Sequence, residues 1–166
     1  MKSRSPASTH KKVVVVLQEG TPVRGYLNPT GLGRIEKLNL LTPDGEHLSM
    51  PIEDVKCVYF VREFSESYEP ERKAFYSRPK LDGLWVKLRF RDGDSIEGIV
   101  SNDLLDLLEN GVQLTPPDLH GNSLRLFIPR SALAEMKVLG VVGIARRVPR
   151  AASATAGASQ PKLFTE

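Results

Sequence analysis

The amino-acid sequence predicts a mostly β protein built from two small β-barrels in tandem, which arose by internal duplication. Three observations support this fold class: a repeat with a period of 73 residues, alternation of apolar and polar side chains, and glycine or proline between short apolar runs. With 166 residues, of which 40% are hydrophobic, the chain can bury one medium core or two small ones.

The repeat relates the first strand of each half, the turn that follows it and the second strand. The pairs related by a shift of 73 are Val13 and Val86, Val15 and Leu88, Leu17 and Phe90, Gly20 and Gly93, Val23 and Ile96, Gly25 and Gly98, and Leu27 and Val100. The same shift relates the two Leu-Thr-Pro triplets at 41–43 and 114–116 without a gap. Further on, a shift of 78 relates Leu48, Met50, Pro51 and Val55 to Leu126, Ile128, Pro129 and Leu133. The second copy therefore carries an insertion before its last two strands.

Alternation assigns the two faces of the strand that begins the second copy. Val86, Leu88 and Phe90 point to one side, and the polar residues between them point to the other. Placing Phe90 opposite Ile96 and Leu88 opposite Gly98 leaves Asp-Gly-Asp as a three-residue loop, which is a permitted hairpin connection. This strand and the next therefore form a hairpin with one buried face.

Four glycines are expected to shape the hairpins of the two copies. Gly20 and Gly93 lie in the loops, where hairpin geometry favours glycine. Gly25 and Gly98 lie inside strands, where glycine usually marks a sharp bend or a bulge that lets a small sheet curl. Strong curvature of this kind predicts a barrel.

Each copy continues with three more apolar strands. They include the Leu-Thr-Pro triplet, the runs that end at Pro51 and Pro129, and the closing runs at 55–61 and 135–142. About five short strands in roughly 55 to 65 residues is the size of an SH3-like or Sm-like barrel. The predicted fold class is therefore mostly β, with two tandem SH3-like or Sm-like small β-barrels joined by a short, partly helical linker.

Domain boundaries follow from local composition. The linker is too aromatic for a free tether, and Pro70 can start one or two helical turns in it. A further short helix is expected after Asn102, which can cap it. The predicted units are a disordered N-terminus at 1–10, a first β-barrel at 11–64, a linker with a short helix at 65–82, a second β-barrel at 83–146 and a disordered C-terminal tail at 147–166.

Composition narrows the classes of function. The formal net charge of +3 is mild, so it permits binding to nucleic acid without implying it. The single cysteine, Cys57, excludes an internal disulfide and a multi-cysteine zinc site, and its apolar neighbours predict a buried side chain. The longest apolar runs are too short for a signal-peptide core or a membrane span, so we expect a cytoplasmic protein with no membrane partner.

No set of residues in the sequence predicts catalysis, a metal site or a bound cofactor. His47 and His120 are equivalent under the shift of 73, but both are expected in polar loops close to glycine. Exposed loop histidines are the favoured interpretation of both.

Several motifs together resemble an uncharacterised bacterial family of tandem small β-domains. These motifs are VKCVYFVREF, VKLRFRDGDSIEG, LTPPD, GNSLRLFIP and the final AL..MKVLG. That resemblance implies a shared fold and no assigned activity. Each copy is also distantly similar to the Sm/Hfq-like barrels, through an acidic-Gly turn followed by VRGYL or IEGIV. Proteins of that kind bind single-stranded RNA on the faces of rings, so the similarity implies RNA binding, although the closing strands here lack the Lys-His and Arg-Gly steps of those proteins.

One strand face is the candidate site for nucleic acid or another anionic partner. Trp85, Lys87, Arg89 and Arg91 place an aromatic ring and three cations on one side of a strand, about 6 to 7 Å apart, a spacing that could follow a phosphate backbone. The alternative is an ordinary solvated face, with Arg89 paired across the hairpin to Glu97. The candidate residues are Trp85, Lys87, Arg89, Arg91, Arg125 and Arg130, the last two near the closing strand.

Two classes of function remain open on the sequence. The first is a non-enzymatic binding or adaptor protein, in which paired barrels offer sheet edges and a groove between domains to an unidentified protein partner or to a second copy in a homo-oligomer. The second is binding of RNA or another nucleic acid through the basic face of the second barrel. The near balance of charge between Leu81 and Arg150, with nine basic and nine acidic residues, favours the first class, and the basic face from Trp85 to Arg91 favours the second.

Overall fold

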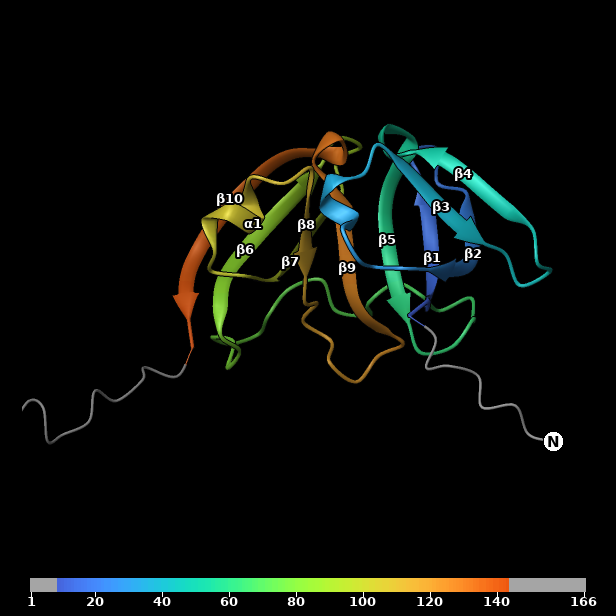
Figure 1. Ribbon diagram of the computed structural model, residues 1–166. Coiled ribbons are helices and arrows are strands. Elements are labelled where there is room, and N and C mark those ends of the chain that lie inside the picture. Colours follow the sequence, from blue (N-terminus) through green and yellow to red (C-terminus); the bar gives the residue numbers. More distant parts are fainter. Residues whose placement is uncertain (1–8, 144–166) are drawn as a thin grey trace, which may run out of the picture.

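The computed structural model describes residues 9–143 of the chain. This part consists mainly of β-strands, with one short helix and three 3-10 turns (Figure 1). The strands are β1 (Lys11–Leu17), β2 (Pro22–Leu27), β3 (Lys37–Leu41), β4 (His47–Pro51), β5 (Val55–Val61), β6 (Gly83–Phe90), β7 (Ser95–Val100), β8 (Gly111–Leu114), β9 (Ser123–Pro129) and β10 (Leu133–Val142). The helical elements are η1 (Leu32–Arg34), η2 (Ile52–Asp54), α1 (Leu104–Leu107) and η3 (Arg130–Ala132). The mostly β fold class is confirmed.

The two halves of the chain have the same strand order. The seven-stranded sheet runs β4-β3-β2-β1-β5-β9-β8, and the three-stranded sheet runs β10-β6-β7. A single bridge joins β7 to β8: the Ile99 amide donates to the Thr115 carbonyl at 3.0 Å, and the Thr115 amide donates to the Ile99 carbonyl at 2.8 Å. With this bridge the second half reads β10-β6-β7-β8-β9, which is the order β5-β1-β2-β3-β4 of the first half.

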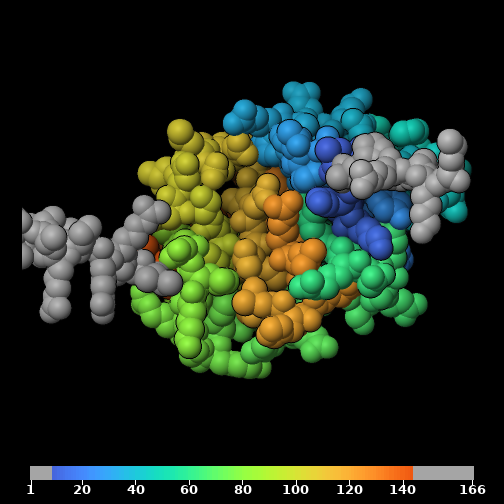
Figure 2. All heavy atoms as spheres, turned by 60° about the horizontal axis from the view of Figure 1, so that its bottom comes forward, coloured from blue at the N-terminus to red at the C-terminus, as the bar shows by residue number. Residues whose placement is uncertain are grey.

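The halves are joined through one strand of each. β5 pairs antiparallel with β9, with Val58 opposite Phe127 and Tyr59 opposite Leu126. In the space-filling view the orange β9 lies between the blue-to-green first half and the yellow-green second half (Figure 2). Within residues 9–143 no ladder of strands closes on itself, so the observed architecture is two curled sheets joined by the bridge between β7 and β8, rather than two closed barrels. The predicted terminal segments lie almost entirely outside the described residues.

Both faces of β1 are buried, because a core lies on each side of it. Val13 and Val15 pack into the core of the first half, with Phe127 of β9. Val14 and Val16 pack into the second core, which also holds the inward residues of β6. The expected inward face of β6 is therefore present, since Val86, Leu88 and Phe90 are all buried there. A continuous apolar run is what a strand covered on both faces requires.

Two strand glycines occupy equivalent crowded positions. A Cβ on Gly25 would lie 2.6 Å from Leu40 Cγ and 2.7 Å from the Leu41 carbonyl oxygen, and a Cβ on Gly98 would collide with Leu114 in the same way. β3 therefore passes very close to β2 at Gly25, and β8 passes very close to β7 at Gly98. The loop glycines Gly20 and Gly93 both have positive φ, at 98° and 95°.

The predicted hairpin register is wrong by two residues. Leu88 lies opposite Ile96 and Val86 opposite Gly98, and the Phe90 amide donates to the Asp94 carbonyl at 2.7 Å. The loop is thus Arg-Asp-Gly and not Asp-Gly-Asp. An Asx turn fixes it, because the Asp92 side chain accepts from the Asp94 amide at 3.0 Å. A slip of two leaves the buried face unchanged.

The gap-free match of the Leu-Thr-Pro triplets is also wrong, by one residue. Lys37 lies opposite Pro51, and Gly111 lies opposite Pro129, so β3 and β8 correspond with a shift of 74. Leu40 and Leu114 are therefore the equivalent side chains. The extra residue lies in the connection before β8, which contains α1 in the second half.

The helix predicted after Pro70 is absent: residues 65–82 form bends and extended chain. The reason is competition from β7, because the Glu97 amide donates to the Lys73 carbonyl at 2.7 Å and the Glu97 carboxylate accepts from the Phe75 amide at 2.7 Å. These bonds tie the segment to the edge of β7 in place of helical bonds.

The other short helix is present as α1. Its N-cap is Asp103, whose side chain accepts from the Leu105 amide at 2.9 Å, so the predicted cap Asn102 was one residue early. Between residues 9 and 143, no helix has the length and apolar character needed to cross a membrane.

Candidate functional site

The six candidate residues lie in three separate places. Trp85, Lys87 and Arg89 share the outer face of β6, where Lys87 and Arg89 are exposed. Trp85 is half-buried, because the Phe75 ring packs edge-on against it at a centroid distance of 6.2 Å. The indole is therefore largely covered by the linker and offers less stacking surface than the sequence indicated.

The outer face of β6 is electrically mixed. Arg89 Nε lies 3.4 Å from Glu135 Oε2, and Lys137 Nζ lies 3.2 Å from Glu135 Oε1. Hydrogen bonds from Lys137 and then Arg89 lower the pKa of the Glu135 carboxyl, so this carboxylate stays charged between its two cations. The expected pair of Arg89 with Glu97 is wrong: Glu97 lies opposite Lys87.

Arg91 and Arg130 line a groove between the two halves, with a volume of about 700 Å³. Lys37, Glu36 and Glu53 of the first half line the same groove, so its three cations face two carboxylates. Arg130 Nη2 donates to the Leu107 carbonyl at 2.7 Å, which holds it toward α1.

Arg125 lies elsewhere, on β9 beside the start of β1. Its guanidinium carbon lies 4.6 Å from the centroid of the Phe60 ring. A shallow groove of about 370 Å³ brings it next to Lys11 and Lys12. Sequence reasoning missed this second basic cluster, because Arg125 lies more than a hundred positions from Lys11 and Lys12 and no local pattern relates them.

Lys56 joins the halves and was also missed. Its ammonium group on β5 contacts Asp92 at 2.5 Å and Asp94 at 2.7 Å in the β6–β7 loop. Burial acts to lower the pKa of Lys56, but the hydrogen bonds and charges of the two carboxylates outweigh it and raise the pKa. The same contact lowers the pKa of Asp92. This ion cluster is structural, because it links β5 to the hairpin of the other half.

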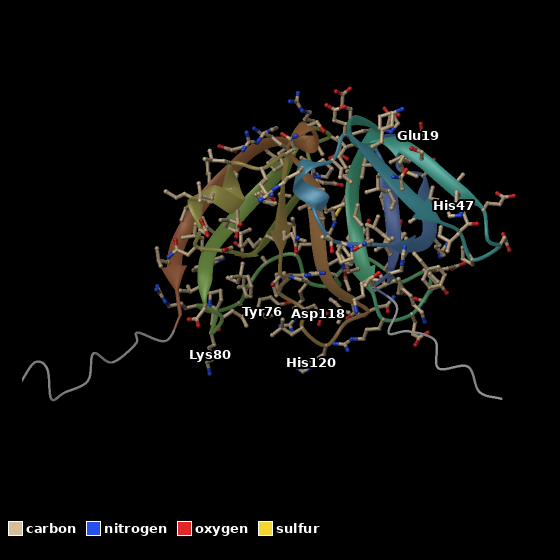
Figure 3. All side chains as sticks on the ribbon, in the orientation of Figure 1. Glu19, His47, Tyr76, Lys80, Asp118 and His120 are labelled. Atoms are coloured by element: carbon tan, nitrogen blue, oxygen red, sulfur yellow. The ribbon has the colours of Figure 1, made fainter. Side chains whose placement is uncertain are left out.

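Cysteine and histidine are two reactive residue types present in the described part of the chain. Cys57 is fully buried, and burial raises the pKa of its thiol, which keeps it protonated. His47 on β4 lies at the right side of the molecule in Figure 3, whereas His120, in the loop before β9, lies at its bottom. Among residues 9–143, no group of three or more His, Cys, Asp or Glu side chains could hold a metal ion.

The outer edge of β10 carries a row of exposed apolar side chains. β10 pairs with β6 on one side only and is the last strand of its sheet. Its exposed fractions are 37% for Met136, 55% for Val138, 43% for Leu139 and 59% for Val141. The sequence showed an apolar closing strand but not its exposure, because that depends on which strand covers it.

The comparisons with known proteins match either a short piece of the chain or a family without an assigned activity. A stretch of 50 residues, 30% of the chain, is 38% identical to proteins named DNA ligase from Xanthomonas campestris pv. campestris (strain B100) and Xanthomonas axonopodis pv. citri (strain 306). A stretch of 44 residues is 41% identical to a DNA ligase of Xanthomonas euvesicatoria pv. vesicatoria (strain 85-10). The chain spans only about 5 to 6% of the length of these curated relatives. No solved structure matches.

The match to a protein family is much longer. It covers residues 9–140, which include all ten strands described above. Only the last two residues of β10 lie outside it. Both halves and the β5–β9 junction are therefore features of one family unit. On this evidence the chain belongs to DUF6982, a family of unknown function.

Proposed function

We propose that this chain is a non-enzymatic binding module that engages another polypeptide by adding a strand to the free edge of β10. The observation that carries the proposal is the row of exposed apolar side chains along that edge. An unpaired edge presents a line of free backbone donors and acceptors, and a partner strand satisfies them while its side chains cover the apolar row.

The composition of β10 supports this use of its edge. Exposed edges are usually short or protected by charges and proline, which discourage unwanted pairing. β10 is ten residues long, and its charged residues Glu135 and Lys137 lie in its first half. From Val138 to Val142 the strand is entirely apolar or glycine. Such a stretch is stable in water when another surface covers it.

We also propose that the two halves are duplicated SH3-like units that have opened and merged at β5 and β9. The common strand order and the matched crowding at Gly25 and Gly98 support a common ancestor unit. Such a unit supplies a sheet edge at each end without any catalytic group, and the protonated, buried Cys57 fits a protein without nucleophilic chemistry.

The test places a photo-crosslinking amino acid at Val138 and, as a matched control, at Leu105, which is 73% exposed on α1. In cells that express each variant, we expect irradiation to give covalent protein adducts from position 138 and few from position 105. Adding Val141→Asp should suppress the adducts, whereas Leu104→Asp should not. Equal labelling at both positions, or none at 138, would contradict binding at this edge.

A second candidate function is binding of nucleic acid, favoured by the short matches to proteins named DNA ligase. The exposed Lys87 lies opposite Lys137 on the outer face of β6 and β10, so two cations are adjacent there. With three phosphate contacts, binding of labelled single-stranded RNA or DNA should fall with a log–log salt slope of about −2. Fluorescence polarisation of the wild type and a variant with Lys87, Arg89 and Lys137 changed to Ser measures this slope, and absence of binding at low salt would exclude the basic face as a site.

A further inference from the structure

The internal junction between β5 and β9 shows how one half of this protein binds another. Tyr59 lies opposite Leu126 and Val58 opposite Phe127 in an antiparallel ladder. All four side chains are buried, and they divide between the two cores. The junction is therefore a tight strand-to-strand contact between two related units.

Strand pairing identifies the equivalents of these two strands. Val13 lies opposite Phe60, and its repeat partner Val86 lies opposite Val138, so β5 corresponds to β10 with a shift of 78. Both ladders break their register at the equivalent place, next to Val55 and next to Leu133. By the same reasoning β4 corresponds to β9, because their prolines, at the ends of both strands, pair with equivalent positions on β3 and β8.

The two edges that remain free are these two equivalents. β4 ends the seven-stranded sheet, β10 ends the three-stranded sheet, and they lie at opposite ends of the molecule (Figure 1). One chain therefore carries one edge of each kind but cannot pair them with each other. Inside the chain β5 and β9 pair with each other, whereas their equivalents β10 and β4 each present an edge without a paired strand.

Exposure differs between the junction and the free edges at equivalent positions. Val58 and Phe60 of β5 are 0% and 3% exposed, whereas their equivalents Met136 and Val138 of β10 are 37% and 55% exposed. On the other side, Leu126 of β9 is 0% exposed. The equivalent of Leu126 is Leu48 of β4, which is 36% exposed. Positions whose side chains are buried in the junction are thus exposed at the equivalent places on the free edges.

We infer that β10 of one chain pairs with β4 of a second copy in the register of the internal junction. Applying the shift of 78 to the β5–β9 ladder places Met136 opposite Ser49, Lys137 opposite Leu48 and Val138 opposite His47. This inference rests on the proposed function and names its partner. The contact is head-to-tail, so it repeats from chain to chain and either closes into a ring or continues as a filament.

The charges along the two edges are complementary in this register. Lys137 lies opposite Leu48, so its stem covers the leucine, and its ammonium group comes within diagonal reach of Glu46 on the same face. Asp44 in the same β3–β4 loop adds negative charge beside that position. A β10–β10 pair with twofold symmetry would offer Lys137 no such partner from the acidic loop.

The test uses single cysteines on separate chains, since the natural Cys57 is buried. Equimolar Met136→Cys and Ser49→Cys proteins are mixed under mild oxidation and examined on non-reducing gels. We expect disulfide-linked dimers in the mixture and none from either protein alone, because head-to-tail pairing never brings two copies of position 136 together. A mixture of Met136→Cys with Glu46→Cys, displaced by three residues or about 10 Å, should cross-link at least tenfold more slowly.

Two results would overturn the inference. Cross-linking of Met136→Cys alone would show symmetric β10–β10 pairing, and no cross-linking in any mixture would show that β4 is not the partner. The photo-crosslinking of Val138 separates the two proposals. Adducts to a different protein with no homotypic disulfide would leave the edge function standing and remove the second copy as partner, whereas absence of both signals would remove both.

Discussion

At the scale of single residues, Lys56 provides one of the polar links between the halves. Lys56→Met keeps the packing over the Phe90 ring, 4.9 Å from the ammonium group, but removes the charge between Asp92 and Asp94. We expect the variant to lose about 1 kcal/mol of unfolding free energy at pH 7. Urea denaturation of the two proteins measures this difference.

The same link gives a pH dependence with a defined sign. The pKa of Asp92 is lowered in the folded state, so its stabilisation is present above the unfolded pKa and is lost as pH falls below about 4. The pKa of Lys56 is raised, so its part is lost only as strongly alkaline pH is reached. The difference between wild type and Lys56→Met should therefore shrink from pH 7 to pH 3, and an unchanged difference would exclude the ion cluster as its cause.

The strand glycines give a second prediction at this scale. Gly98→Ala places a methyl group into Leu114 and the Thr115 carbonyl, and we expect a loss of about 1 to 3 kcal/mol through forced displacement of β8. Gly140→Ala is the matched control, because its methyl group would meet only Trp85 at an ordinary 3.8 Å. Thermal unfolding gives the melting temperatures of the two variants. Equal melting temperatures would contradict the close approach of β7 and β8.

At the scale of elements, the linker is held by β7 and not by helix formation. Glu97→Ala removes the carboxylate that accepts from the Phe75 amide, so the segment around Lys73 should detach more often. We expect tryptic cleavage after Arg72 or Lys73 to become several-fold faster, with Glu97→Gln close to the wild type because its side chain still offers an acceptor. Unchanged cleavage in Glu97→Ala would show that other contacts hold the segment.

The elements also show what the sequence could and could not predict. Alternation placed Val86, Leu88 and Phe90 on a buried face, because periodicity depends only on which side is covered. It could not fix the hairpin register, since a slip of two residues preserves the same faces and the Asx turn at Asp92 decides between them. The linker helix was predicted from Pro70 and the six residues after it, and a contact with a strand more than twenty residues away overrode this local preference.

At the scale of the whole molecule, the β5–β9 junction could not be predicted from the sequence. The repeat indicated two separate units, but pairing between them depends on contacts far apart in the chain. The same applies to the candidate site. Arg125 and Arg130 were grouped with Arg89 from the sequence, but the fold places each of the three in a different part of the molecule. The apolar run of β10 was visible, whereas its exposure follows from the strand order.

Because the second core contains residues of both halves, the two halves should unfold together. The only tryptophan, Trp85, reports on the second half, and the only cysteine, Cys57, reports on the first. We expect the fluorescence of Trp85 and the thiol reactivity of Cys57 to change at the same urea concentration. Two separated transitions would show that the halves are independent domains.

The mass of the native protein in solution, measured by sedimentation equilibrium over a range of concentrations, shows whether chains pair head to tail. The chain has a mass of 18.4 kDa, and head-to-tail pairing of β10 with β4 predicts a multiple of this value that returns to one chain in Val138→Asp but not in Leu105→Asp. A mass of one chain for the wild type at every concentration would contradict it.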